Sequence, residues 1–363
     1  MTDLYVGMLS GTSRDGVDLV LVSFDGNRPE VHQSLCLPYP PELAALLARL
    51  IRPGTRPAEG ELQQADDLLT SFFGQAVNQL LSVADVKPDS VTAIGSHGQT
   101  VWHNPPESIQ LGAPEGIARH TGITTVGRFR QADLAHGGQG APLAPLLHRA
   151  IFKPETGTRI VLNLGGIANI SVIGSDGSLL GFDTGPANCL LDAWIRENRS
   201  EAFDRNGNWS AAGSVDQMML LELMADPYFK KPPPKSTGVE YFNLNWLKER
   251  VELDSYDPAD VQSTLAQLTA STAAAAMSAH RPDEVLICGG GVHNMDLMRR
   301  LHALISARRV TSTALFGLNP DNVEGVLFAW LARERLAGHA QDTRAITGAT
   351  EPVLLGDVVL GTE

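Results

Sequence analysis

Short apolar runs alternate along the chain with longer segments in which apolar residues recur every three or four positions. The short runs are rich in β-branched residues and mostly end in glycine-bearing turns, which predicts strands. These cover residues 4–8, 17–24, 92–96, 123–126, 160–164, 169–173, 179–182 and 285–288. The longer segments predict helices over residues 41–51, 60–83, 113–120, 143–152, 187–197, 258–279, 294–307 and 321–337. Residues 204–213 and 230–243 predict loops. The alternation of strands and helices is typical of an α/β fold.

One strand pattern occurs twice. Residues 4–25 predict a strand, a turn of small residues and a second strand, and residues 160–186 predict the same arrangement followed by a third strand. Two antiparallel hairpins, each opening a half of the chain, predict two similar domains. We expect these to be residues 1–130, with the tail of about 338–363 packing back on them, and residues 131–337; the length of 363 residues fits two domains.

Composition excludes several classes of protein. The net charge of −13 argues against a protein that follows nucleic-acid phosphates, and no apolar stretch reaches the ~20 residues that span a bilayer. The N-terminus lacks the basic and apolar regions of a secretory signal. The three cysteines are far apart and form no C-x-x-C pair, which favours a reducing compartment. We therefore expect a cytoplasmic protein that binds neither nucleic acid nor membrane.

The first turn joins two predicted strands and holds glycines, hydroxyls, one cation and two carboxylates. Small residues allow backbone N–H groups to approach an anion, and a carboxylate nearby suits water-coordinated Mg²⁺. The metal candidates are Asp15 and Asp18. An ordinary hairpin loop, which favours the same residue types, is the alternative. The candidate anion-binding residues are Gly11, Thr12, Ser13, Arg14, Asp15, Gly16, Val17 and Asp18.

A second small-residue turn contains Gly165 and Gly166, and Asp183 follows at the end of a strand. A carboxylate at a strand end beside glycines is a candidate general base. As the alternative, Asp183 caps the helix predicted to begin near residue 187.

A third glycine cluster, Gly289, Gly290 and Gly291, follows a strand and opens a helix, which is typical of phosphate or nucleoside binding. The spacing is not G-x-G-x-x-G, and the chain contains no G-x-x-x-x-G-K-[ST]. These absences disfavour a dinucleotide fold and exclude a Walker-type NTPase.

Other polar residues allow two interpretations each. His97 and His103 have no third ligand at a metal-site spacing, so a polar pocket wall is favoured over a metal site. Arg130 is a candidate for binding a carboxylate, and a surface ion pair is the commoner role of such a residue. Glu324 lies in an apolar helix and points either to solvent or into a cleft.

The three turns in this order resemble the actin-like ATPase superfamily, which includes acetate and sugar kinases, heat-shock 70 chaperones and actin. Five strings narrow the resemblance to the family of anhydro-N-acetylmuramic acid kinases and cover essentially the whole chain. They are G-T-S-R-D-G-V-D (11–18), S-H-G-Q-T-V-W-H (96–103), N-L-G-G-I-A-N-I-S (163–171), F-D-T-G-P-A-N (182–188) and C-G-G-G-V-H-N (288–294). The fold that this resemblance implies is a pair of actin-like, ribonuclease H-like domains flanking an ATP cleft.

The activity that the resemblance implies is the ATP-dependent conversion of 1,6-anhydro-N-acetylmuramic acid to N-acetylmuramic acid 6-phosphate in cell-wall recycling. Asp183 is then the base that activates water. The first turn and the Gly165-Gly166 turn then hold phosphates with Mg²⁺, and the third turn, 289–291, holds adenosine. The candidate for the lactyl carboxylate is Arg130, and those for the sugar hydroxyls or N-acetyl group are His97, Gln99 and Glu324. The family also implies a homodimer.

Two alternatives remain at this point. One is a kinase of the same fold that acts on another hexose or acetylhexosamine, and the other is an actin-like ATPase of the chaperone or filament type. Fold does not decide between them, because function resides in the site. A kinase needs its sugar for ATP turnover, whereas a chaperone or filament hydrolyses ATP slowly without one.

Overall fold

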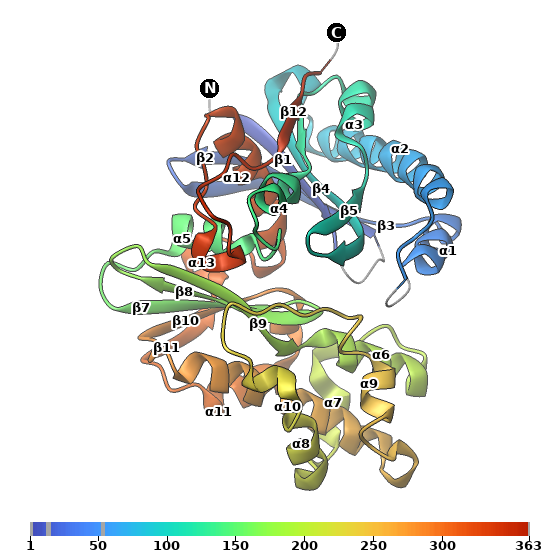
Figure 1. Ribbon diagram of the computed structural model, residues 1–363, viewed down its shortest axis with the longest axis vertical. Coiled ribbons are helices and arrows are strands. Elements are labelled where there is room, and N and C mark those ends of the chain that lie inside the picture. The colour runs from blue at the N-terminus through green and yellow to red at the C-terminus, as the bar shows by residue number, and fades with distance from the viewer. Residues whose placement is uncertain (1–2, 12–15, 52–54, 362–363) are drawn as a thin grey trace. The chain divides into compact units, whose positions relative to one another are not determined.

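The computed structural model describes residues 3–11, 16–51 and 55–361 and divides the chain into two compact units (Figure 1). One unit comprises Met1–Ile151 with Asn322–Glu363, and the other comprises Phe152–Asp321. The sequence-based boundaries were 130 and 337, so residues 131–151 and 322–337 are grouped with the first unit rather than the second. Both units combine strands and helices, which confirms the α/β class.

Among the described residues, the sheet of the first unit has seven strands. Three consecutive antiparallel strands form one side, and the strands after them in the chain lie parallel to the first one. The order is β12 (Asp357–Val359), β6 (Thr125–Gly127), β4 (Val91–Asn104), β1 (Leu4–Ser10), β2 (Gly16–Asp25) and β3 (Arg28–Pro38), with β5 (Glu107–Leu111) pairing with β4.

The sheet of the second unit has five strands within the part of the chain that the structure describes. Its order is β11 (Arg309–Ser312), β10 (Glu284–Cys288), β7 (Thr158–Leu164), β8 (Ile167–Gly174) and β9 (Leu179–Pro186). Strands β7, β8 and β9 are antiparallel neighbours, and β10 and β11 continue parallel to β7. This is the order of β6, β4, β1, β2 and β3 in the first sheet, so the prediction of two similar halves is confirmed.

Helices cover both faces of the first sheet. Alternate residues of β1, among them Val6 and Met8, join a core with α1 (Pro41–Leu50) and α2 (Glu59–Ala84). The opposite face packs on α12 (Val323–Leu336), where Gly7 and Gly95 are paired in register. A Cβ at these two positions would lie 1.8 Å from the Gly325 oxygen and 1.9 Å from the Phe328 oxygen. Only glycine lets the helix backbone lie this close to the strands.

Three further helices belong to the first unit. Figure 1 shows α3 beside α2, and the two helices are in contact. These helices are α3 (Pro114–Thr121), α4 (Phe129–Ala135) and α5 (Ala144–Phe152), and a single turn, α13 (Arg344–Thr347), lies near the C-terminus.

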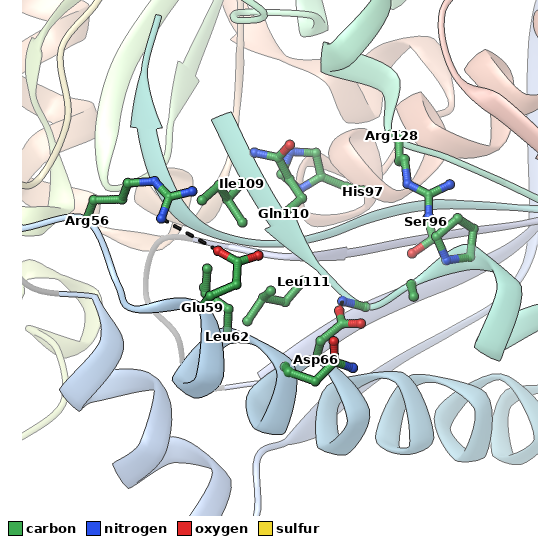
Figure 2. Close-up of a pocket in the computed structure, with 14 residues that line it drawn as sticks. Arg56, Glu59, Leu62, Asp66, Ser96, His97, Ile109, Gln110, Leu111 and Arg128 are labelled. Carbon is green, nitrogen blue, oxygen red and sulfur yellow. Dashed lines mark hydrogen bonds and ion pairs between the residues drawn. The ribbon is translucent and has the colours of Figure 1, made fainter. Parts of the chain in front are cut away.

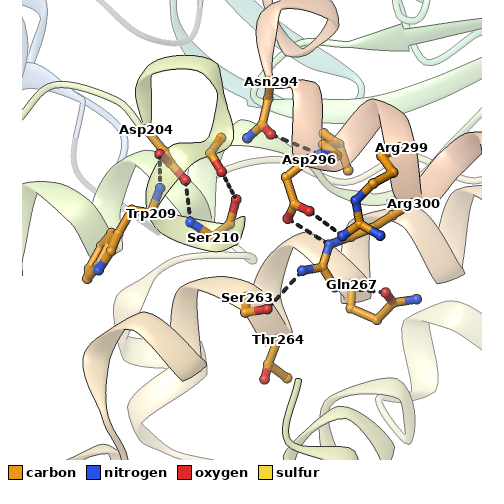
Figure 3. A network of polar contacts seen from close by, with 12 residues as sticks. Asp204, Trp209, Ser210, Ser263, Thr264, Gln267, Asn294, Asp296, Arg299 and Arg300 are labelled. Carbon is orange, nitrogen blue, oxygen red and sulfur yellow. Dashed lines mark hydrogen bonds and ion pairs between the residues drawn. The ribbon is translucent and has the colours of Figure 1, made fainter. Parts of the chain in front are cut away.

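The second sheet packs on α10 (Pro258–Ser278) and α11 (Met295–Leu304), whose apolar residues share a core with β7, β8 and β9. The side chain of Arg300 in α11 is paired with Asp296 of the same helix and links α11 to α10 (Figure 3). The Arg300 guanidinium donates to Asp296 at 2.8 Å, to the Ser263 hydroxyl at 2.8 Å and to the Gln267 amide oxygen at 3.0 Å. These bonds fix the start of α11 directly after the third glycine turn.

The remaining helices of the second unit are short, apart from α6 (Asn188–Arg199). They are α7 (Asn208–Ala212), α8 (Gln217–Met224) and α9 (Leu244–Lys248). Residues 204–213 were predicted to be a loop, and this was wrong over α7. The Asp204 carboxylate accepts hydrogen bonds from the Trp209 and Ser210 amides, five and six positions further along the chain, so a side-chain bond across the preceding turn stabilises the start of this helix (Figure 3).

All predicted strands and helices are present in the described residues, each within a few residues of its expected ends except β4 and β9, which are longer. The prediction lacked β3, β5, β11 and β12. Strand β3 lies at the edge of its sheet and alternates exposed with half-buried residues, so it lacks an apolar run. None of the described helices is both long and apolar enough to cross a bilayer.

Replacing Gly95 by alanine should destabilise the first unit by about 3 kcal/mol, because the new methyl group overlaps the Phe328 carbonyl. In the described part of the chain, no non-neighbouring atom lies within 4 Å of a Cβ added to Gly60, so Gly60→Ala should change stability by less than about 1 kcal/mol. Urea unfolding of the two variants measures both effects. Equal stability of Gly95→Ala and the wild type would contradict the close helix-to-sheet packing.

Candidate active site

The first turn is braced from β4 by Gln99. The Ser10 hydroxyl lies 2.5 Å from the Gln99 amide oxygen and 2.8 Å from the Gly16 carbonyl, which joins the two ends of the turn. The Gln99 amide nitrogen donates to the Thr100 carbonyl at 3.1 Å and to the Gly11 carbonyl at 3.5 Å. Gln99 was predicted to contact the sugar, and the bonds described here are all to protein groups around the turn.

Four predicted phosphate-binding residues, Thr12, Ser13, Arg14 and Asp15, lie outside the described residues. Val17 is buried, and Asp18 is exposed on β2. Asp18 lies on the same face as Val20, which contacts Gly325 of α12. Half-buried Glu324 directly precedes Gly325 in the first turn of α12. The two predicted carboxylates Asp18 and Glu324 are therefore on the same side of the first sheet.

His97 and Arg130 lie together, although 33 positions separate them in the sequence. Arg130 donates to His97 Nε2 at 2.9 Å, and His97 Nδ1 lies 3.0 Å from the Gly98 carbonyl, which can only accept. This geometry requires a neutral imidazole protonated on Nδ1. Burial, assisted by Arg130, lowers the pKa of His97 to about 3 and that of His103 to about 4. Both histidines are therefore uncharged at neutral pH.

A cavity of about 310 Å³ opens beside His97, between α2 and strands β4 and β5 (Figure 2). Ser96 and Gln110 line it, and in the described part of the chain the Ser96 hydroxyl and the Gln110 amide oxygen have no hydrogen-bond partner. Arg56 and Arg128 bring charge to the wall, and each pairs with glutamate, Arg56 with Glu107 and Arg128 with Glu115. The cavity therefore offers buried polar atoms to a small polar group.

Two neighbours of Arg130 have structural roles. Arg128 forms a bidentate bond with Glu115 at 2.8 and 2.7 Å, the surface ion pair that was the alternative interpretation for this segment. Asp133 is fully buried and accepts from the Gly140 amide and from the hydroxyls of Thr343 and Thr347. It fixes the C-terminal segment to α4.

Asp183 lies near the end of β9 and is buried, with 9% of its surface exposed. Its carboxylate accepts the Thr237 amide at 2.9 Å, and its own amide donates to the Lys235 carbonyl at 3.0 Å. The Tyr228 hydroxyl donates to the Asp183 carbonyl at 2.8 Å. The alternative interpretation of Asp183 as a helix cap is wrong, because α6 begins after Ala187 with no side-chain cap.

The loop that holds Asp183 is fixed by a second carboxylate, Asp226. Asp226 is buried and accepts from the Tyr241 hydroxyl, the Trp246 indole and the Arg250 guanidinium, and these donors hold its pKa below the usual value despite burial. The Lys235 ammonium nitrogen lies 4.6 Å from the centre of the Tyr228 ring. Burial lowers the pKa of Lys235 below its ordinary value, although the nearby Asp183 carboxylate acts in the opposite direction. The hydrogen bonds of Asp226 therefore hold the loop in place, and the loop in turn holds the Asp183 carboxylate.

The two glycine turns of the second unit meet. Strands β7 and β10 are parallel neighbours, so their ends lie at one edge, and a Cβ on Gly289 would lie 2.4 Å from Asn163 Oδ1. Gly291 packs on Leu164 in the same way, at 2.5 Å. The next helix is a 3₁₀ turn (Gly290–His293), and Asn294 caps α11 after it, so the glycines precede the α-helix rather than open it.

This pair of turns fits a nucleotide. Among the residues that the structure describes, no non-neighbouring atom lies within 4 Å of a Cβ built on Gly290, and none lies nearer than 3.6 Å to one built on Gly165. The Gly166 carbonyl accepts the Ala187 and Cys189 amides, which anchors the turn to α6. Flat backbone with open space above it can approach a phosphate or nucleoside closely.

Among the described residues there is no group of three or more His, Cys, Asp or Glu side chains that could hold a metal ion. Mg²⁺ bound to phosphates needs only one or two protein carboxylates. Of the two predicted ligands, Asp18 is among the described residues and Asp15 is outside them.

Sequence reasoning did not select several residues around Asp183. Thr237 and Lys235 belong to a segment predicted only as a loop, and Asn169 was quoted only within the second-turn motif. The sequence feature that could have drawn attention to Lys235 and Thr237 is the polar run Lys-Ser-Thr-Gly directly after three prolines.

Comparisons with known proteins agree over nearly the whole chain. A family described as anhydro-N-acetylmuramic acid kinase matches residues 3–361. Proteins named anhydro-N-acetylmuramic acid kinase from Xanthomonas campestris pv. campestris and Coxiella burnetii are 45% and 44% identical, over 98% of this chain and 97% of theirs. A ROK family glucokinase from Streptomyces griseus, solved with glucose and AMPPNP, aligns at 16% identity and a TM-score of 0.41 over 91% of this chain and 99% of its own. A likeness this distant has no weight for function.

Stability should fall in acid because of His97 and His103. The unfolded chain protonates them below about pH 6.5, whereas the folded chain resists until about pH 3 to 4. Each therefore contributes stability that is complete above pH 6.5 and decreases by about 1.4 kcal/mol per pH unit below it. In urea unfolding between pH 6 and 4.5, His97→Gln should show a slope smaller by that amount. An unchanged slope would mean that His97 is protonated in the folded chain.

Proposed function

The chain belongs to the anhydro-N-acetylmuramic acid kinase family, and on that premise we propose how its residues perform the reaction. The chain converts 1,6-anhydro-N-acetylmuramic acid, water and ATP to N-acetylmuramic acid 6-phosphate and ADP. The observation that carries the residue assignment is the buried Asp183 carboxylate, held by the Thr237 amide at a strand end beside two open glycine turns.

Asp183 acts as the general base. It removes a proton from water as the water oxygen bonds to the anomeric carbon, and the bond from that carbon to O6 breaks. O6 keeps the electron pair of the broken bond and attacks the terminal phosphorus of ATP, so that ADP leaves. Water approaches from the face opposite O6, as in inverting glycoside hydrolysis, where one carboxylate activates the water. No protein acid is required, because phosphorus takes up the leaving oxygen.

The glycine turns bind ATP. In this proposal Gly165 and Gly166 bind phosphate, residues 11–18 of the first turn also bind phosphate, and Gly289–Gly291 bind the adenosine. The tight packing of Gly289 and Gly291 on β7 supports the last of these assignments. Phosphoryl transfer depends mainly on alignment and charge neutralisation. Mg²⁺, when bound, supplies part of that neutralisation, and Asp15 or Asp18 is its proposed protein ligand.

The sugar is held by groups of the first unit. Arg130 binds the lactyl carboxylate. The His97 and His103 rings fix the orientation of the Arg130 guanidinium, and because these rings are neutral they do not offset its positive charge. His97, Gln99 and Glu324 face the sugar hydroxyls or the acetamido group in this proposal. The buried Ser96 hydroxyl beside His97 supports a polar, uncharged subsite.

No observation favours the other functions considered. The family match extends from residue 3 to residue 361, which leaves a chaperone, a filament or a kinase of another hexose without support. We also propose that the chain works in the cytoplasm as a homodimer. The three cysteines, all in the described residues and none of them in a disulfide there, support a reducing compartment.

ATP turnover should require the anhydro sugar. With Mg²⁺, ADP release should be fast with 1,6-anhydro-N-acetylmuramic acid and at background with N-acetylmuramic acid, N-acetylglucosamine or glucose. The product mass should exceed that of the sugar by one water and one phosphoryl group. Asp183→Asn should lower kcat by about 10³-fold, because the base is lost.

The matched control is Asp176→Asn, which changes an exposed carboxylate in the turn between β8 and β9. It should keep wild-type kcat. Equal turnover with a sugar that has no anhydro bridge, or full activity of Asp183→Asn, would refute the ring-opening mechanism.

A further inference from the structure

A row of polar side chains crosses the second sheet beside Asp183. Asn163 of β7 is paired with Asn169 of β8, and Asn169 is paired with Asp183 of β9. Directly paired residues place their side chains on the same face, with Cβ atoms about 5 Å apart. The residues on either side of Asn169, Ala168 and Ile170, belong to the apolar core on the other face. Asn163, Asn169 and Asp183 therefore form one polar row, with Asn169 in the middle.

Asn169 carries an unsatisfied acceptor. Its side-chain oxygen Oδ1 is buried and has no hydrogen-bond partner in the described part of the chain. Buried polar atoms of folded proteins are nearly always paired, and the exceptions concentrate where a ligand or water completes the set. This acceptor lies next to the base candidate, so the missing partner belongs to the reaction site.

Asp183 is held from the other side. Strand β9 is at the edge of the sheet, and the loop beside that edge contributes the Thr237 amide to Oδ2 and the Lys235 carbonyl to the Asp183 amide. The carboxylate is thus fixed from the loop, while Asn169 lies on the inner side. The charged or titratable side chains packed near Asp183 are those of Lys235 and Tyr228, and both come from this loop rather than from β8.

We propose that Asn169 is a second catalytic residue that binds the attacking water. The water donates one hydrogen to Asn169 Oδ1 and the other to Asp183, so its lone pair points at the anomeric carbon. Asp183 takes its proton as the carbon–oxygen bond forms, and the other hydrogen stays on the new hydroxyl group, still bonded to Asn169. This inference rests on the proposed function, because it requires Asp183 to be the base.

The test compares Asn169→Ala with Asn169→Asp. Asn169→Ala removes the acceptor and should lower kcat about 30-fold, with the KM values for sugar and ATP within threefold of wild type. Asn169→Asp keeps an acceptor oxygen and adds a carboxylate next to Asp183. Like charges raise the pKa of the base, so the acid limb of the kcat/KM profile should move up by about one pH unit. The shift of that limb shows that position 169 lies beside the base, and the loss of kcat at unchanged KM in Asn169→Ala is what a merely structural asparagine would not give.

The control is Asn198, an exposed asparagine of α6 whose amide donates to the Trp194 carbonyl. Asn198→Ala and Asn198→Asp should keep wild-type kcat and pH profile. Circular dichroism and the Tm of each variant establish folding; if Asn169→Ala does not fold, the near-isosteric Asn169→Asp decides by its pH profile.

The outcomes separate two failures. Asn169→Ala with kcat within twofold of wild type, or Asn169→Asp with an unmoved acid limb, would overturn the role of Asn169 while an inactive Asp183→Asn leaves the proposed function intact. An active Asp183→Asn would instead refute the base assignment on which both depend.

Discussion

The first unit depends on one backbone contact, in which α12 lies directly on β1 and β4. Gly7 and Gly95 are in register under this helix, and any side chain there would overlap its carbonyl groups. The contact also sets the candidate site, because Phe328 of α12 packs 4.7 Å from the His97 ring and 5.5 Å from Phe129. His97 and the start of α4 are thus positioned by a helix more than 190 residues away in the sequence.

Asp183 is held by a different physical means. The Thr237 amide and the Tyr228 hydroxyl donate hydrogen bonds to Asp183 near the end of edge strand β9. The loop that contains these two donors is stabilised by the hydrogen bonds that buried Asp226 accepts. A base needs a fixed direction. The Thr237 backbone donor supplies it, because an amide holds the carboxylate without itself carrying a charge.

The agreement between sequence and structure follows the strength of the local signal. Buried strands such as β1 and β7 are apolar runs bounded by glycine turns, and their prediction was confirmed. Edge strand β3 and the short helix α7 lack such a signal, because the first is half exposed and the second is a helix of five residues that depends on hydrogen bonds to the Asp204 carboxylate just before it. Likewise, the motif around Gln99 was evident, but the bonds from Gln99 to the first turn were not.

The sequence alone determined the α/β class, the repeated hairpin, the three glycine turns and the choice of Asp183. These rest on patterns that span a few residues, where periodicity and turn chemistry are readable. The tertiary structure decided which of these residues meet: Thr237 with Asp183, 54 positions apart, and Arg130 with His97. It also decided that Asn163, Asn169 and Asp183 form a row, because strand register is set by burial across the whole sheet.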